Sequence, residues 1–330
     1  MEPFPYKKEH IDPHQLWENA VNLDLAPLQE IPLPDLNTNR SPSWRSIPRK
    51  CKWEYQGKIL GFVTAPDMYD KVNKLGDFFS EEARMKASRK GYLSPYDFYH
   101  QNYDLVVQEA ARLEKESTVG IQPHRYWLRE ALYLSTVECT TFKIAVSKSL
   151  FKFFQSKKVL DPSSGWGDRL LGAAAAGVEV YHGVDANSNL QSCYAHIFEF
   201  LTSKGTASQY KMMIGDFLEV TLDQQYDTVF TSPPFFDYEL YSEDSAQSYY
   251  NRPTLNSWMT EFFYPYLEKA WSALQCGGHF ALYVNDTKNV KYVHDMCTFI
   301  TDQLGGTFLG ILAITNQGFK YGNPIWVWKK

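Results

Sequence analysis

The pattern of apolar and polar positions changes near residue 157. Before this point, from residue 67 to about 155, apolar residues recur at helical spacing, which predicts a series of amphipathic helices. After it, short apolar runs alternate with helical stretches, which is typical of repeated strand-helix-strand units. The predicted strands are seven apolar runs, at residues 157–164, 178–185, 210–217, 226–233, 278–286, 307–315 and 323–330.

This alternation predicts an α/β fold with a seven-stranded, mainly parallel, doubly wound sheet and helices on both faces. The last two runs are close together, so we expect an antiparallel hairpin at one edge of the sheet. Residues 1 to about 60 are rich in Pro, Asn and Ser, and we expect extended or loop structure there. We therefore predict a mostly helical or irregular N-terminal region, 1–135, followed by an α/β domain, 136–330.

Composition excludes some classes of protein. Apolar residues make up 44% of the chain, enough for a large core, and the net charge of −5 argues against a protein coated in positive charge. The five cysteines have no C-x-x-C spacing, so we expect reduced thiols in an intracellular compartment. The N-terminus lacks a secretory signal, no apolar run reaches the length of a membrane span, and the histidines show no ligand spacing, so no membrane or metal partner is predicted.

The loop after the first predicted strand is a candidate cofactor site. Gly165 and Gly167 allow a tight turn and a close approach of the backbone to a ligand, and Gly172 allows the following helix to pack tightly on the sheet. A nicotinamide dehydrogenase would have a similar loop, but here the full G-x-G-x-x-G is missing. The loop begins with Asp161, whose carboxylate would repel a pyrophosphate and would suit the cationic methionine portion of S-adenosyl-L-methionine.

Two further carboxylates end the next predicted strands. Asp185 can accept hydrogen bonds from both hydroxyls of a ribose, and such charge-assisted bonds are each worth ~1.5–3 kcal/mol. Asp216 is placed to accept from an adenine amino group. Both residues therefore fit the adenosine portion of the same cofactor.

A diproline sequence follows the fourth predicted strand, where Ser232, Pro233, Pro234 and Phe235 stand in order. It resembles the Asp/Asn/Ser-Pro-Pro-Tyr/Phe/Trp signature of the amino-methyltransferases, and residues 161–167 resemble the D-x-x-x-G-x-G cofactor motif of that family. The resemblance covers roughly residues 135–330, and the two motifs together are also similar to DNA methylases of phages and large DNA viruses. It implies a Rossmann-like class I methyltransferase fold and S-adenosyl-L-methionine as the cofactor.

The resemblance also assigns roles to residues. The segment 138–151 is similar to the family segment that contacts the methionine end of the cofactor, although Thr replaces Asn in its turn. An ordinary amphipathic helix would explain this segment nearly as well. The cofactor-binding residues predicted in all are Thr140, Thr141, Phe142, Asp161, Ser163, Gly165, Gly167, Asp185 and Asp216.

The diproline corner predicts a catalytic site. An exocyclic amine is a poor nucleophile because its lone pair is delocalised, so the site must draw the lone pair out of plane towards the sulfonium methyl. The Ser232 side chain and a backbone carbonyl near Pro233 would be the two acceptors, held rigid by Pro233 and Pro234. Phe235 would stack on the planar target, as aromatic rings do on flipped bases.

The target is expected to be a nucleic acid, with DNA (cytosine N4 or adenine N6) favoured and RNA open. Because little chain lies between or after the two motifs, we expect residues 1–135 to recognise it. The best candidates are Arg45, Arg49, Lys50 and Lys52 in a basic run that also holds two tryptophans, and the second group is Arg84, Lys86, Arg89 and Lys90. The alternatives are a methyltransferase acting on a protein glutamine or a small molecule, and an inactive nucleic-acid-binding partner.

Overall fold

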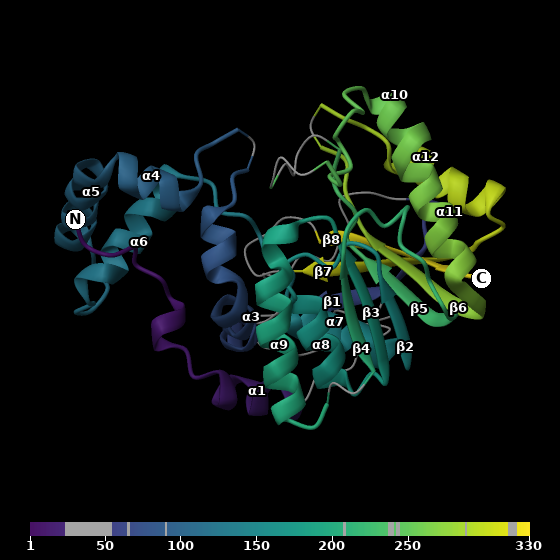
Figure 1. The fold of residues 1–330 in the computed structure, drawn as a ribbon, viewed down its shortest axis with the longest axis horizontal. Coiled ribbons are helices and arrows are strands. Elements are labelled where there is room, and N and C mark those ends of the chain that lie inside the picture. Colours follow the sequence, from purple (N-terminus) through teal and green to yellow (C-terminus); the bar gives the residue numbers. More distant parts are fainter. Residues whose placement is uncertain are drawn as a thin grey trace, which may run out of the picture.

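An eight-stranded sheet forms the centre of the protein (Figure 1). The computed structural model describes residues 1–23, 55–64, 67–89, 91–206, 209–236, 241, 245–287, 289–315 and 322–330. The strand order is β1-β7-β8-β6-β5-β2-β3-β4, and β8 alone runs antiparallel to its neighbours. The strands are β1 (Ile59–Thr64), β2 (Lys158–Asp161), β3 (Val180–Asp185), β4 (Tyr210–Ile214), β5 (Tyr226–Thr231), β6 (Leu274–Tyr283), β7 (Thr307–Thr315) and β8 (Asn323–Lys329). This mostly parallel arrangement is the class I methyltransferase-like α/β fold that the sequence predicts.

The prediction of seven strands was wrong, because the N-terminal region contributes an eighth. Strand β1 begins at the end of the stretch, residues 1 to about 60, for which extended or loop structure was expected, and it pairs in parallel with β7 from Ile59↔Ile311 to Thr64↔Thr315. The antiparallel hairpin of β7 and β8 was predicted, but not its place in the sheet, since β1 covers the outer side of β7. The other strands were predicted because they alternate with helices along the chain. Strand β1 is short and no predicted helix precedes it, so this pattern did not reveal it.

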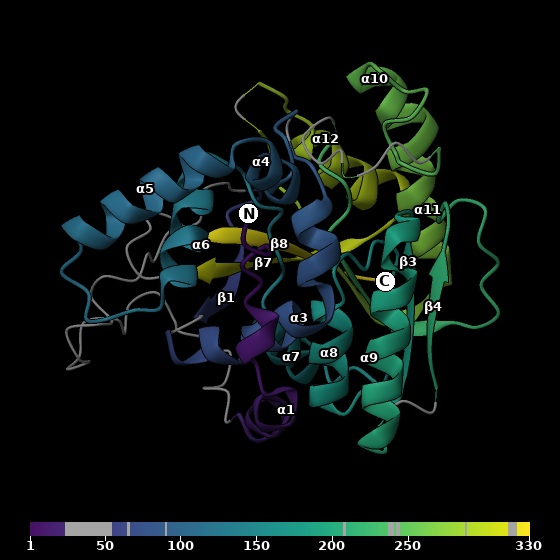
Figure 2. The same ribbon diagram turned by 60° about the vertical axis from the view of Figure 1, so that its left-hand side comes forward.

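Helices cover both faces of the sheet (Figures 1 and 2). The strand side chains alternate between two cores: Val159 and Phe230 belong to one, and Leu160 and Val229 to the other. The first core is closed by α1 (Pro13–Asn22), α3 (Asp67–Lys86), α7 (Ile144–Phe153), α8 (Asp168–Ala176) and α9 (Gln191–Ser203). The second is closed by α10 (Leu255–Trp258), the π-helical turn η4 (Met259–Phe263), α11 (Tyr264–Ala273), α12 (Val293–Thr298) and the π-helical turn η5 (Phe299–Gln303).

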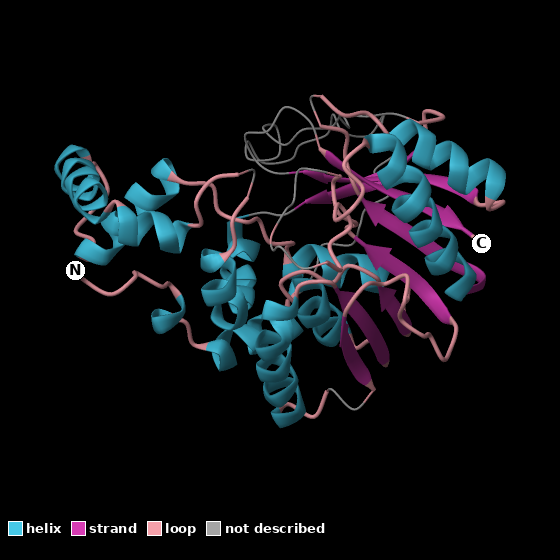
Figure 3. Ribbon diagram, turned by 45° about the horizontal axis from the view of Figure 1, so that its top comes forward, coloured by secondary structure: helices cyan, strands magenta, loops and turns pink. Residues whose placement is uncertain are grey.

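A separate helical unit lies beside this α/β body (Figure 3). It consists of α4 (Pro95–Gln101), α5 (Tyr103–Glu116) and α6 (His124–Ser135), with Phe4 of the N-terminal segment in its core. Helix α3 joins the two parts, since its Leu75 and Phe79 pack in the first sheet core and its Met85 packs in the helical core. The N-terminal region is therefore mostly helical, as predicted, while its first part also builds the α/β body.

Local sequence explains several helix ends. Asp12 caps α1 by accepting from the backbone nitrogens of His14 and Gln15, and Ser94 caps α4 in the same way from Asp97. Each cap is followed by a proline, the residue best suited to the first helical turn. Among the helices of the described ranges, none combines the length and the apolar character needed to cross a bilayer.

We expected Gly172 on α8 to allow close packing on the sheet. Its closest approach is instead to α7. A Cβ atom there would lie 2.0 Å from Ser147 Oγ and 2.9 Å from the Ile144 carbonyl oxygen. We expect Gly172→Ala to lower the free energy of unfolding by ~1–3 kcal/mol, because the two helices would have to move apart. Urea denaturation would measure it, with Gly120→Ala as the control, since a Cβ atom at Gly120 meets open space. Equal stability of the two variants would contradict this packing.

Candidate functional site

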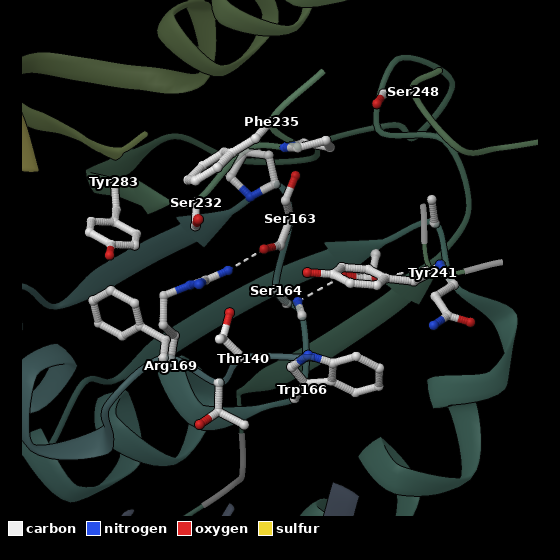
Figure 4. A pocket seen from close by; sticks show the side chains of 18 of the residues that line it. Thr140, Ser163, Ser164, Trp166, Arg169, Ser232, Phe235, Tyr241, Ser248 and Tyr283 are labelled. Carbon is white, nitrogen blue, oxygen red and sulfur yellow. Dashed lines mark hydrogen bonds between the residues drawn. The ribbon is translucent and has the colours of Figure 1, made fainter. Parts of the chain in front are cut away.

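A cavity of about 730 Å³ lies at the carboxyl ends of the parallel strands (Figure 4). Segments that follow β2, β3, β4, β5 and β6 all contribute to its wall, together with residues 140–143 before α7. Ligands of open α/β sheets bind at this edge, and the volume is within the ~300–1,000 Å³ of small-molecule sites. The cavity is therefore the candidate functional site.

Most of the predicted site residues meet in this cavity. Of the predicted catalytic and cofactor-binding residues, three do not line it: Asp161, Gly167 and Pro233, all of which are buried. The two predicted motifs nevertheless adjoin each other, because β2 and β5 are neighbouring strands and Ser163 N donates to Thr231 Oγ1 at 3.1 Å. The predicted residues that line the cavity are Thr140, Thr141, Phe142, Ser163, Gly165, Asp185, Asp216, Ser232, Pro234 and Phe235.

Asp161 is fully buried and already has cationic and hydroxyl partners. Its carboxylate accepts from Arg169 Nε at 2.7 Å and Arg169 Nη2 at 3.3 Å, and Tyr181 donates to it at 2.7 Å. Burial raises the pKa of the Tyr181 hydroxyl, so Tyr181 stays a neutral donor. The expectation that Asp161 offers its carboxylate directly to a bound cation does not fit this geometry. Its observed contacts instead fix Arg169, which lines the cavity.

The glycine loop takes the conformation that its sequence requires. Gly165 and Gly167 both have left-handed backbones, with φ of 61° and 92°. A Cβ atom at Gly167 would also lie 2.5 Å from Ile197 Cδ1. Both the backbone conformation and this contact therefore disfavour a larger residue at position 167. The turn brings Gly165 N within 2.7 Å of Asp185 Oδ2, and Tyr194 donates its hydroxyl to the Gly165 carbonyl.

Asp185 is the last residue of β3, and Asp216 follows the end of β4 at Ile214. The Asp185 carboxylate accepts from Gly165 N and, at 3.0 Å, from Asn187 N, while Asp216 Oδ1 accepts from Leu218 N at 2.9 Å. Burial raises the pKa of Asp185 to about 6, although the two backbone donors act in the opposite direction. Each carboxylate oxygen can accept more than one hydrogen bond, so both residues keep acceptor capacity towards the cavity.

The diproline corner leaves the sheet directly after β5 and is held by the residue that follows it. Phe236 has a left-handed backbone, φ 47°, which is costly for a large side chain. Its buried ring packs against Trp258 and Tyr249, with centroids 5.7 and 5.4 Å away. This anchoring holds Ser232 and Phe235 at the cavity (Figure 4), which Pro234 also lines.

The cavity also contains residues that sequence reasoning missed. Tyr283 ends β6, and its ring lies 6.5 Å from that of Phe235 and 5.4 Å from that of Phe142. Asn285 follows on the same segment, and its buried Oδ1 has no hydrogen-bond partner among the described residues. The signal was available, because polar residues at the carboxyl end of a parallel strand are candidates in any open α/β sheet. Further lining residues that were not predicted include Trp166, Asp168, Arg169, Tyr266 and Asp286.

Most of the predicted nucleic-acid contacts either lie outside the described residues or form ion pairs within the protein. Arg45, Arg49, Lys50 and Lys52 lie outside the described residues, as does Lys90 of the second group. Arg84 is buried and pairs with Asp77 and Glu138, and Lys86 pairs with Glu82. Arg84 is therefore a structural cation rather than a surface contact, which corrects the second prediction for this residue alone, and Arg89 of the same group lines the cavity. No cluster of His, Cys, Asp and Glu that could hold a metal occurs in the part of the chain that the structure describes.

No family model and no curated protein matches the sequence. Solved structures with a similar fold include TrmN from Thermus thermophilus, at 14% identity and a TM-score of 0.41 over 73% of this chain and 82% of that chain. Magnesium protoporphyrin IX methyltransferase (ChlM) from Synechocystis PCC 6803 is 14% identical, with a TM-score of 0.41 over 71% of this chain and 94% of that chain. TehB from Haemophilus influenzae is 14% identical, with a TM-score of 0.37 over 56% of this chain and 61% of that chain. The chain thus spans less than two thirds of TehB, and we base the function on its own residues.

Proposed function

We propose that the protein is an S-adenosyl-L-methionine-dependent methyltransferase that modifies an exocyclic amino nitrogen of a nucleic-acid base. The observation that supports this most is that the glycine loop after β2 and the diproline corner after β5 border one cavity. A donor held by the first and an amine held by the second would meet without any movement of the sheet. Holding two reactants in line in this way is worth ~7–11 kcal/mol of the barrier.

The residues present fit the cofactor. Asp185 would accept from the ribose hydroxyls, and Asp216 would accept from the adenine amino group, since both face the cavity with acceptor capacity remaining. Gly165 allows the backbone to approach the ligand closely, because a Cβ atom is absent there. The part of the cavity near Thr140 and Thr141 would receive the methionine portion. When bound, the cofactor supplies a methyl group on a sulfonium.

The other wall fits a planar amine. Phe235, Tyr283 and Phe142 form an aromatic surface on which a base could stack. The Ser232 hydroxyl and the unpartnered Asn285 Oδ1 are acceptors at the ends of neighbouring strands, since Thr231 pairs with Leu282 in the β5–β6 register. They would orient the two amine protons and leave the nitrogen lone pair free for the methyl carbon. The new N–C bond forms as the C–S bond breaks, and one amine proton is then released to solvent.

A second target class is favoured by the charge of the helical unit. The segment 95–135, from the start of α4 to the end of α6, holds four Arg and Lys residues against six Asp and Glu residues. This balance does not suit a phosphate backbone, so the unit would recognise a protein glutamine or a small molecule better than DNA. The nucleic-acid proposal therefore depends on the basic run that contains Arg45, Arg49, Lys50 and Lys52. A protein glutamine or a small molecule would need no contact with this run.

Transfer of a tritiated methyl group from the cofactor would test the proposal. Incubation with separate pools of DNA, RNA and protein should label nucleic acid, and digestion to nucleosides should place the label on an N-methylated base. Label in protein alone would move the target to the second class. Absence of transfer to every pool, with the cofactor nevertheless bound, would support the inactive partner instead.

Asp185→Ala is expected to weaken cofactor binding by ~10–150-fold, which corresponds to the loss of one or two charge-assisted hydrogen bonds. Calorimetric titration with S-adenosylhomocysteine measures this without catalysis. Glu179→Ala is the matched control, because it removes the same charge from the exposed opposite end of β3. Unchanged affinity of the Asp185 variant would remove this residue from the site.

A further inference from the structure

Asp168 is a buried carboxyl at the cavity wall that the proposed chemistry does not yet use. It is the first residue of α8, it is 2% exposed, and it lines the cavity. Its Oδ1 has no hydrogen-bond partner among the described residues. An ionisable group is seldom buried without a partner, so the position calls for a cation or a proton.

The charges around Asp168 do not balance. Arg84 pairs with Asp77 and Glu138, and Arg129 pairs with Glu81 and again with Glu138. Arg89, the third guanidinium, donates to the Glu138 carbonyl and lines the cavity. Against these three cations stand four carboxyl groups, of Asp77, Glu81, Glu138 and Asp168, so among the described residues one negative charge is left over when all are ionised. Arg169 also lies near Asp168, but it pairs with Asp161 and leaves this balance unchanged.

Helix α3 fixes the place of the Asp168 carboxyl. Gly76 on α3 faces it so closely that a Cβ atom at Gly76 would lie 2.2 Å from Asp168 Oδ1. The carboxyl is thus confined between α3 and the cavity. The same network holds the cavity loop before α7, because Arg84 donates to the Cys139 carbonyl, next to Thr140.

We propose that Asp168 accepts the α-ammonium group of the methionine portion of the cofactor, the role that the sequence assigned to Asp161. The inference rests on the proposed function and deepens it. Asp161 is saturated by Arg169 and Tyr181, whereas Asp168 lines the cavity and its Oδ1 has no hydrogen-bond partner among the described residues. The ammonium supplies the missing positive charge of the network.

This placement links cofactor binding to pH. Burial and the neighbouring Asp77 raise the pKa of Asp168 to about 7, while Arg84 of α3 and Arg169 of α8 act in the opposite direction. Below that pH the carboxyl carries a proton, which must leave before the ammonium can pair with it. The dissociation constant should therefore rise as the pH falls through about 7, by up to ~10-fold per unit, and be flat above it.

Calorimetry of the full chain with two neutral-sulfur ligands tests this inference. S-adenosylhomocysteine carries the amino-acid portion, and 5′-methylthioadenosine lacks it. At pH 8, Asp168→Asn should bind S-adenosylhomocysteine ~10-fold or more weaker than the wild type, with the pH dependence near 7 lost, and should bind 5′-methylthioadenosine equally well. Equal binding of the second ligand also shows that the variant is folded.

The control and the contrary outcomes are distinct. Asp216→Asn, at the adenine end, should weaken both ligands alike. Should Asp168→Asn bind S-adenosylhomocysteine with wild-type affinity and wild-type pH dependence, Asp168 would not be the ammonium acceptor. Should wild-type protein bind neither ligand, the proposed cofactor itself would be wrong.

Discussion

Methyl transfer by the double variant Ser232→Ala/Phe235→Ala should fall by ~10³-fold or more. Removal of one polar group that acts on the reacting atoms costs ~10²–10³ in rate, and loss of one stacking ring costs a further ~1–3 kcal/mol. Both residues line the cavity at the diproline corner, and neither belongs to the predicted cofactor set. Single-turnover transfer with tritiated cofactor measures the rate, and titration with S-adenosylhomocysteine should show affinity close to wild type.

The matched control makes the same two changes away from the cavity. Ser149 and Phe153 both lie on α7, where the Ser149 hydroxyl donates to the Ala145 carbonyl and the Phe153 ring is partly exposed. Ser149→Ala/Phe153→Ala should keep its transfer rate. A double variant at the corner that transfers methyl groups at the control rate would rule out the corner as the catalytic site.

Arg169→Leu should lower the free energy of unfolding by ~3–5 kcal/mol, because it leaves the buried Asp161 carboxylate without its cation. Arg169 is 4% exposed and Asp161 is 0% exposed, and Nε of the first lies 2.7 Å from Oδ2 of the second. The Tyr181 hydroxyl would remain as a donor, but it carries no charge to compensate the carboxylate. Urea or thermal unfolding of the cofactor-free protein measures the loss.

Lys157→Leu is the control for this ion pair. Lys157 faces Glu179 at 3.7 Å, and both side chains are well exposed, so its removal should change stability by less than ~1 kcal/mol. Equal stability of the two variants would contradict a stabilising role of the Arg169–Asp161 pair. Double replacement of Arg169 and Asp161 by Leu and Asn should recover part of the loss.

The sequence predicted the parallel part of the fold because each buried strand is followed by a helix of clear period. Strand β2 and its glycine loop, and β5 and its prolines, were placed within a few residues. Strand β1 was missed because its pairing with β7 is a contact between residues far apart in the chain. The contact of α3 with the cofactor loop was missed for the same reason, since nothing near Gly76 in the sequence points to Asp168.

The candidate site also contains residues that the local sequence indicates and residues that only the folded structure identifies. Residues recognised by a motif, such as Asp185 and Ser232, do line the cavity, although their roles stay predictions. Asp161 was assigned to a ligand because its partner could not be seen in the sequence, where Arg169 is one of several arginines. Asn285 and Asp168 belong to no motif, and only their burial without a hydrogen-bond partner for one oxygen singles them out.

The pairing of β1 with β7 has a consequence for how the chain is made. The backbone of β1 leaves the ribosome early, yet Lys58 beside it contacts Phe308, 250 residues later. At ~5–20 residues per second, this segment waits on the order of 10–50 s for its partner. A nascent chain must keep that strand from pairing elsewhere during this time, and we expect chaperone binding to concentrate on residues 59–64 until β7 has been synthesised.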